Sequence, residues 1–163
     1  MTSPSPITVA PAAEAEVPLI LSFIRGLAEY EKLAHACVAT EADLRQTLFG
    51  PRPYAEVLIA RAGGEPAGFA LYFHNYSTFL ARPGLYLEDL FVLPAFRRRG
   101  IGRALFAALA RVARDRGCGR MEWSVLNWNA PSIDFYKSLG AEPLDEWTTF
   151  RLAGGAIEKV AEG

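Results

Sequence analysis

The sequence is poor in the residues that build metal centres and disulfide frameworks. Its 163 residues include only two cysteines and two histidines. Cys37 and Cys118 lie far apart and form no C-x-x-C pair, and His35 and His74 have no metal-ligand spacing. The scarcity of cysteine and histidine argues against a fold held together by zinc or by disulfide bonds. It predicts inert thiols, no metal site and a reduced, cytoplasmic protein.

An excess of one charge and long apolar runs are also missing. The formal net charge of −1 argues against a protein that binds polyanions over its whole surface. The run Arg97–Arg99 is short and has no interleaved aromatic residues, so we expect no nucleic-acid partner. No apolar run reaches membrane-spanning length, and the N-terminus lacks the basic and apolar regions of a signal peptide. We therefore expect no membrane partner.

The composition, 51% hydrophobic and 21% charged, is typical of a globular protein. No repeat, low-complexity tract or linker divides the chain. We expect residues 1–6, rich in serine and proline, to be disordered, residues 7–153 to form a single domain, and residues 154–163 to be a C-terminal tail.

The hydrophobic pattern predicts an α/β chain whose sheet is largely antiparallel at first and has one parallel crossover after Leu93. Residues 75–84 are expected to form a polar loop. The other elements are predicted from three signals. These are apolar residues at three- and four-residue spacing, helix-capping residues, and glycine or proline residues that end an element. The expected strands are Ile7–Ala10, Tyr54–Arg61, Ala67–Tyr76, Leu85–Leu93, Arg120–Leu126, Glu142–Leu144 and Thr148–Leu152. The expected helices are Glu14–Leu33, Thr40–Phe49, Gly100–Arg116 and Asn129–Gly140.

The most informative stretch is Leu85–Gly102, where an apolar strand with two acids leads into a basic glycine loop and then a helix. Gly100 and Gly102 leave the backbone bare, so a phosphate could approach the amides at the positive end of the helix. Arginine side chains beside the loop suit phosphate oxygens. A P-loop and a dinucleotide-binding fingerprint are both ruled out by their missing residues. A solvated basic turn remains the alternative at this point.

Two motifs make a family resemblance specific. The segment Arg97–Gly102 matches the R/Q-x-x-G-x-G/A signature of the GNAT acetyltransferases, and 127–141 resembles their second conserved block. Among the branches, the chain resembles the spermidine/spermine acetyltransferase group, which includes thialysine acetyltransferases. The resemblance covers about residues 7–152. It rests on Leu27–Glu31, Leu85–Val92 and the run W-N-x-P-S-I-x-F-Y that begins at Trp128.

The resemblance implies the GNAT fold, a twisted, mixed, mostly antiparallel sheet of about six or seven strands flanked by about four helices. It also implies acetyl-CoA as co-substrate, and a homodimer whose interface borders the acceptor site. The pantetheine arm would lie along one strand, with the pyrophosphate at the glycine loop. The cofactor-binding residues would be Leu90, Phe91, Val92, Arg97, Arg98, Arg99, Gly100, Ile101, Gly102, Arg103, Asn129, Ser132 and Tyr136.

The reaction would be attack of an amine on a thioester. An alkylamine with a pKa of about 10 is protonated at neutral pH, so the site must attract a cation and then remove its proton. Glu88 and Asp89 supply carboxylates in an otherwise apolar strand. Neighbours on a strand point to opposite faces unless a bulge intervenes, so we favour Glu88 as the base, directly or through a water. Asp89 would shape the field, and simple pairing of both acids with arginines stays open.

The resemblance assigns Tyr136 as the acid that protonates or hydrogen-bonds the departing thiolate, with a core aromatic as the alternative. Asn129 and Ser132 would serve as helix cap and cofactor contacts. Tyr30 and Glu31 match a polyamine-contacting pair, in which an acid and an aromatic face hold an alkylammonium group. A solvent-facing helix end explains them equally well.

The resemblance is weakest in the regions that choose the acceptor, which are the end of the first strand, residues 75–84 and residues 145–148. The predicted activity is therefore N-acetylation of a small primary amine, either a polyamine or diamine or a thialysine-like amino acid. Other acceptors, such as an antibiotic or a protein amino group, stay open. A non-catalytic acyl-CoA-binding domain is the alternative from another class.

Overall fold

The computed structural model describes residues 5–163, which fall into two compact units. The first unit extends to Ser124 and the second runs from Val125 to Gly163. Most of the segment predicted to be disordered, residues 1–4, lies outside the described residues. The prediction of a single domain over 7–153 stays a prediction.

The first unit is built on a five-stranded sheet in the order β1-β2-β3-β4-β5. The first four strands pair antiparallel and β4 pairs with β5 in parallel, which confirms the predicted mixed, mostly antiparallel α/β fold. The strands are β1 (Ile7–Pro11), β2 (Glu56–Ala62), β3 (Glu65–Ser77), β4 (Arg82–Val92) and β5 (Met121–Trp123).

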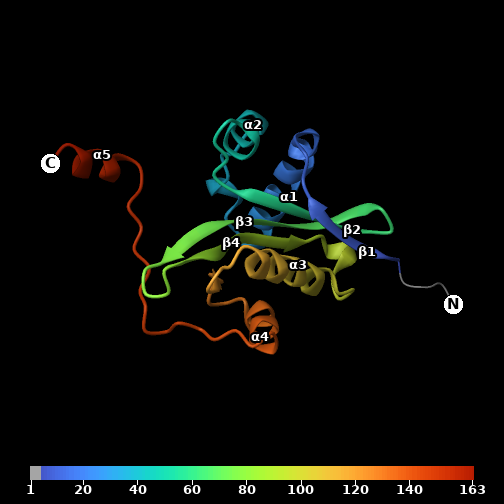
Figure 1. The fold of residues 1–163 in the computed structure, drawn as a ribbon. Coiled ribbons are helices and arrows are strands. Elements are labelled where there is room, and N and C mark those ends of the chain that lie inside the picture. The colour runs from blue at the N-terminus through green and yellow to red at the C-terminus, as the bar shows by residue number, and fades with distance from the viewer. Residues whose placement is uncertain (1–4) are drawn as a thin grey trace. The chain divides into compact units, whose positions relative to one another are not determined.

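Helices cover both faces of this sheet (Figure 1). Helices α1 (Val17–Tyr30) and α2 (Glu41–Phe49) lie on one face, and α3 (Ile101–Asp115) lies on the other. Helix α1 turns its buried residues toward the sheet, where Phe23 stacks on Phe69 of β3 with ring centroids 5.3 Å apart. A full transfer of such a side chain from water contributes about 2 kcal/mol or more. The core on this face consists of Val17, Ile20, Leu21, Phe23, Leu44, Leu48, Val57, Ile59, Phe69 and Phe91.

A local signal sets the start of α2 where the sequence predicted it. Thr40 caps α2 by accepting a hydrogen bond from the Asp43 backbone N–H, and the Asp43 carboxylate accepts one from the Thr40 N–H in return. The long helix predicted from Glu14 begins later, because Glu14–Glu16 forms a separate 3-10 turn. Two further 3-10 turns lie at Ala34–Ala36 and Pro94–Phe96.

The end of α3 is tied to the sheet by a polar cluster. Arg116 donates two hydrogen bonds to the Glu56 carboxylate, at 2.6 and 2.9 Å, and its Nη1 lies 2.9 Å from His74 Nε2. The paired guanidinium holds the pKa of Glu56 below its usual range. This bidentate geometry orients α3 against β2 and β3.

Two predicted boundaries are wrong. The segment 75–84 is not a loop, because β3 and β4 continue to pair as far as Ser77 and Arg82. The strand predicted at Arg120–Leu126 is shorter, since β5 pairs with β4 only at Met121–Trp123.

The second unit contains α4 (Ala130–Ser138) and α5 (Gly155–Ala161). The strand pair predicted at 142–144 and 148–152 is absent from this unit, so the described chain has five strands rather than six or seven. A strand needs a neighbouring backbone that pairs with it, and Pro143 has no N–H to donate. The chain instead turns here, with the Trp147 N–H donating to the Leu144 carbonyl at 3.2 Å. The predicted C-terminal tail contains α5, a fifth helix beyond the four expected.

A close approach between β3 and β4 gives a stability test. A Cβ added at Gly68 would lie 2.6 Å from the Phe91 carbonyl oxygen, which belongs to the backbone and cannot move aside alone. We expect Gly68→Ala to lower the free energy of unfolding by about 1–3 kcal/mol, measured by urea denaturation. Gly155→Ala is the control, because nothing lies near its added Cβ. Equal stabilities for both variants would contradict this packing.

Candidate functional site

The edge of β4 that faces β5 is paired over only three residues, Leu85–Leu87. Beyond Leu87 this edge has no strand partner among residues 5–163, although β4 runs on to Val92. The unpaired stretch Glu88–Val92 leads through Pro94–Phe96 to the basic glycine loop. An open strand edge offers backbone donors and acceptors to an extended ligand, as it would to another strand.

A β-bulge at Glu88 marks the point where the β4–β5 pairing stops. Leu71 of β3 is opposite Asp89, while the next residue, Tyr72, is opposite Leu87, so Glu88 is the extra residue. Residues opposite each other share a face of the sheet. Asp89 therefore lies on the same face as Leu71, which packs against the core under α1 and α2. The sequence alone left open whether such a bulge occurs.

The bulge brings two acids of β4 near Glu31, the residue that caps the end of α1. Burial, together with the negative charges of Glu88 and Glu31, raises the pKa of Asp89 to about 6. Burial also raises the pKa of Glu31, with a further contribution from Glu88. We call Glu31, Glu88 and Asp89 the acidic cluster. The charges that raise the pKa values of Asp89 and Glu31 come from other members of this cluster and are negative. A cation placed among them would relieve both the repulsion and the burial penalty.

The glycine loop forms the predicted anion-binding shape. Arg98 and Gly100 both have left-handed backbone conformations, with φ of +61° and +84°. Gly100 is also the residue before the first turn of α3. The first backbone N–H groups of a helix have no partner within the helix, and here the 15-residue α3 aligns its positive end with the loop. The predicted residues Ile101, Gly102 and Arg103 form this first turn.

The side chains of Arg97 and Arg99, both predicted to contact the cofactor, lie over aromatic rings of the chain itself. Arg97 Nε donates to the Val92 carbonyl at 3.1 Å, and its guanidinium lies 5.0 Å from the Tyr30 ring centroid and 5.7 Å from that of Phe91. Arg99 lies over the Phe96 ring at 5.1 Å. The aromatic face of Tyr30, predicted to hold a substrate cation, therefore holds a cation of the chain itself.

The other predicted cofactor contacts on β4 are Leu90, Phe91 and Val92. Leu90 and Val92 are partly buried, and Phe91 is buried against α1. A Cβ added at Gly26 of α1 would lie 2.7 Å from Phe91 Cε1, so this strand and helix approach closely. Gly26 was not among the predicted site residues, although a glycine inside an amphipathic helix is a signal of such an approach.

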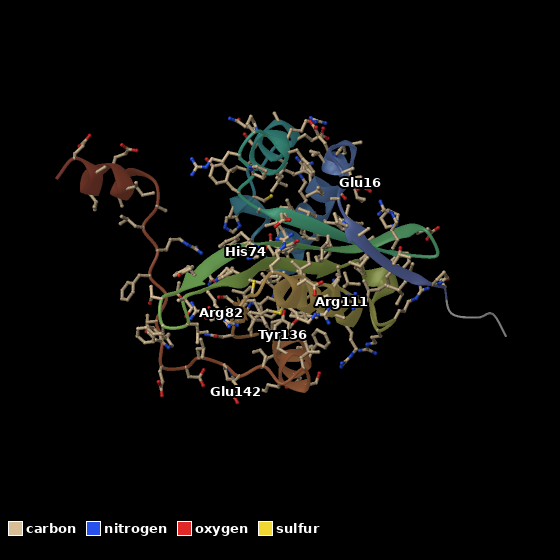
Figure 2. All side chains as sticks on the ribbon, in the orientation of Figure 1. Glu16, His74, Arg82, Arg111, Tyr136 and Glu142 are labelled. Atoms are coloured by element: carbon tan, nitrogen blue, oxygen red, sulfur yellow. The ribbon has the colours of Figure 1, made fainter. Side chains whose placement is uncertain are left out.

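The second unit carries the remaining predicted residues. Asn129 is buried and caps α4, since its Oδ1 accepts a hydrogen bond from the Ser132 N–H at 3.4 Å. This confirms the predicted cap. Tyr136 lies on α4, and its ring is tilted against Phe135 with centroids 5.8 Å apart. Figure 2 labels Tyr136 on this helix. The roles of these side chains toward a cofactor stay predictions.

Metal-ligating clusters and membrane-spanning helices are both absent from the described chain. Among residues 5–163, no group of three or more His, Cys, Asp and Glu residues has the arrangement of a metal site. Over the same residues, none of the helices has the length and apolar character needed to span a bilayer. Cys37 and Cys118 are both free and partly buried.

Comparison with known proteins assigns this architecture. Residues 25–141 match the model of the Acetyltransferase (GNAT) family. Thialysine N-epsilon-acetyltransferase of Bos taurus is 40% identical over 166 residues, covering 95% of this chain and 97% of the relative. L-ornithine N5-acetyltransferase of Arabidopsis thaliana is 32% identical over 194 residues, covering 91% and 85%.

Solved structures share the fold. An integron cassette protein of Vibrio cholerae superposes with a TM-score of 0.81 at 25% identity, covering 96% of this chain and 98% of its own. An aminoglycoside acetyltransferase from an uncultured soil sample, solved with sisomicin, has a TM-score of 0.75 at 19% identity, covering 90% and 97%. The second likeness bears on the fold alone.

The partly buried Asp89 predicts a pH-dependent stability. Because its pKa is raised, folded Asp89 retains its proton between about pH 4 and 6 while the unfolded chain loses it. Stability is therefore lost as the pH rises through this window. Asp89→Asn should be more stable than the native chain by about 2 kcal/mol at pH 8, and this gain should vanish by about pH 4.

Urea denaturation at pH 4, 6 and 8 measures this difference. Asp115→Asn is the control, since the Asp115 side chain is exposed beside Arg114 and should leave the stability nearly unchanged. A gain for Asp89→Asn that is the same at all three pH values would show that the carboxylate is not penalised by its surroundings.

Proposed function

Because the chain belongs to the Acetyltransferase (GNAT) family and is an enzyme of that type, we propose that it transfers the acetyl group of acetyl-CoA to a primary amine of a small molecule. The acceptor would be a polyamine or diamine, or a thialysine-like amino acid. The observation that carries the proposal is the acidic cluster at the β4 bulge, beside an open strand edge that leads to an anion-binding loop.

The residues of the first unit suit acetyl-CoA. The left-handed Arg98 and Gly100 and the first backbone N–H groups of α3 would hold the pyrophosphate, with Arg103 on the first turn of the helix. The open edge Glu88–Val92 would hold the pantetheine arm by backbone hydrogen bonds. Bound there, acetyl-CoA supplies an activated acyl carbon and a thiol leaving group. A backbone N–H of the edge would stabilise the carbonyl oxygen as it becomes negative.

The acidic cluster would select and activate the amine. An alkylammonium group neutralises carboxylates that otherwise repel one another, which favours binding of the protonated amine. Glu88, exposed at the bulge, would take the proton directly or through a water. Asp89 is the second carboxylate in reach, and its pKa of about 6 suits a base at neutral pH. The free amine can then attack the thioester.

Three residues of the second unit have roles that the family resemblance assigns. Tyr136 would donate its phenolic hydrogen to the departing thiolate, whose pKa of about 8.5 lies below that of a phenol, so a strong hydrogen bond is sufficient. Asn129 and Ser132 would contact the cofactor from the start of α4, where the cap already orders them. Metal is not required for this chemistry.

The relatives support the acceptor class, since their names record acetylation of a side-chain amino group on thialysine or ornithine. A homodimer and a cytoplasmic location belong to the same proposal. Light scattering tests the first, and a monomer at all concentrations would contradict it.

The first test is direct. Purified protein with acetyl-CoA should acetylate at least one of lysine, thialysine, ornithine, cadaverine, putrescine and spermidine, with a mass increase on the amine and release of coenzyme A thiol. Calorimetry should show that coenzyme A binds, and that Gly100→Val weakens binding because a β-branched residue resists a φ of +84°. Acetyl-CoA binding without transfer to any of these amines or to aminoglycosides would favour a non-catalytic domain.

The second test assigns the proton transfers. Glu88→Gln should lower kcat/KM for the amine by about 100-fold or more, and Tyr136→Phe should lower kcat by a similar factor. Glu65→Gln is the matched control, because Glu65 is exposed at the hairpin between β2 and β3. A larger loss in Asp89→Asn than in Glu88→Gln would move the base to Asp89. Full turnover by Tyr136→Phe would remove the acid role.

A further inference from the structure

A charged pair lies at the start of β5, formed by Arg120 just before the strand and Glu122 within it. Arg120 Nε is 2.6 Å from Glu122 Oε1, and both side chains are partly exposed, at 41% and 28%. Asn75 of β3 donates a hydrogen bond from Nδ2 to the same Glu122 oxygen at 3.3 Å. Arg120 also reaches the Tyr76 carbonyl through Nη2 at 3.5 Å. The proposed chemistry uses none of these residues.

The strand register puts this pair on the same face of the sheet as the acidic cluster. On β3, Leu71, Phe73 and Asn75 alternate with their neighbours and so share a face. Their partners on β4 are Asp89, Tyr86 and Gly84. Tyr86 in turn is opposite Glu122 of β5, and its hydroxyl lies 3.2 Å from Ser124 Oγ. Asp89 and Glu122 are therefore two ends of one surface.

The two ends are separated by a short aromatic floor. Phe73 and Tyr86 pack on each other between them, with ring centroids 5.1 Å apart. Asp89 is three residues from Tyr86 along β4, which corresponds to about 10 Å at most, and the bulge shortens it. The four-carbon stem of lysine is about 6 Å long when extended. With a hydrogen bond of about 3 Å at each end, a lysine that lies along the apolar rings can join the two ends of this floor.

Asn75 orients Glu122 at a cost in folding stability. Asn75 Oδ1 is buried and has no hydrogen-bond partner among the described residues, although its amide donates to Glu122. A Cβ at Gly84 would lie 2.1 Å from that Oδ1, so only glycine leaves room for Asn75 in this position. A buried acceptor without a partner is unfavourable. The unpaired Asn75 Oδ1 is therefore consistent with a role of Asn75 in holding the Glu122 carboxylate in place.

From this juxtaposition we infer that Arg120 and Glu122 form a head-group subsite that binds the α-carboxylate and α-ammonium of a basic amino acid. The inference rests on the proposed function. Glu122 binds the ammonium, with Asn75 positioning it, and Arg120 binds the carboxylate. Two of the five guanidinium donors of Arg120 are used in the contacts described here, which leaves donors for a carboxylate. The side-chain amine then extends over Phe73 and Tyr86 to the acidic cluster.

This arrangement decides between the acceptor classes. A diamine presents a second ammonium but no carboxylate, so it satisfies Glu122 and leaves Arg120 facing a like charge. A basic amino acid satisfies both charges and exchanges one ion pair for two. The acceptor is therefore a basic amino acid with a long side chain, rather than the diamine of the same length.

The test compares amines that differ only by the α-carboxylate, L-lysine with cadaverine and L-ornithine with putrescine. The native enzyme should have the higher kcat/KM for the amino acid of each pair. Arg120→Gln should reduce the ratio of the two kcat/KM values by about 10- to 100-fold, because it removes a charged hydrogen bond that only the amino acid makes. Arg120→Lys, which retains the charge without the fork, should give an intermediate ratio. Glu122→Gln should lower kcat/KM for both members of a pair.

Arg114→Gln is the matched control, since Arg114 is an exposed arginine of α3 paired with Asp115, and it should leave the ratio unchanged. Circular dichroism and thermal unfolding verify that each variant folds. An unchanged ratio in Arg120→Gln, or a native preference for the diamine, overturns the subsite while amine acetylation stands. If no amine is acetylated, the proposed function fails instead. Calorimetry with L-lysine and cadaverine then decides the subsite, and equal affinities would overturn it.

Discussion

One extra residue in β4 is the constraint on which the rest of the site depends. With Glu88 inserted, Leu87 and Asp89 no longer share a face, although a regular strand would place them together. The pairing between β4 and β5 also ends at this point. A single bulge thus turns an acid toward α1, exposes a second acid and opens a strand edge. All three features would serve the proposed reaction between an amine and an extended thioester.

The open edge is supported on both sides by packing rather than by further strands. Phe91 is buried against α1, and Gly68 allows β3 to approach the backbone of β4. Arg97 joins the end of α1 to the start of the anion-binding loop, because it stacks on Tyr30 and donates to the Val92 carbonyl. The side that would bind an amine and the side that would bind a phosphate therefore share one arginine, which suggests that their geometries are set together.

The acidic cluster shows how a function can oppose stability. Burial of Asp89 next to Glu88 and Glu31 raises its pKa, which means that the folded chain is less stable at neutral pH than it would be without that charge. In the proposed function, the same unfavourable field would attract a cation and provide a base near neutral pH. Asn75, with its buried and unsatisfied Oδ1, repeats this pattern at the other end of the same face.

Local chemistry determined much of this protein from the sequence by itself. The Thr40–Asp43 capping box, the Asn129 cap and the glycine loop at Gly100 depend on contacts within a few residues, so their patterns predicted them. Only the tertiary structure decided the bulge at Glu88, the stacking of Arg97 and the contact of Asn75 with Glu122. The strands predicted near Pro143 failed for the same reason. Register, pairing and charge–charge contacts depend on residues far apart in the chain, and no local pattern specifies them.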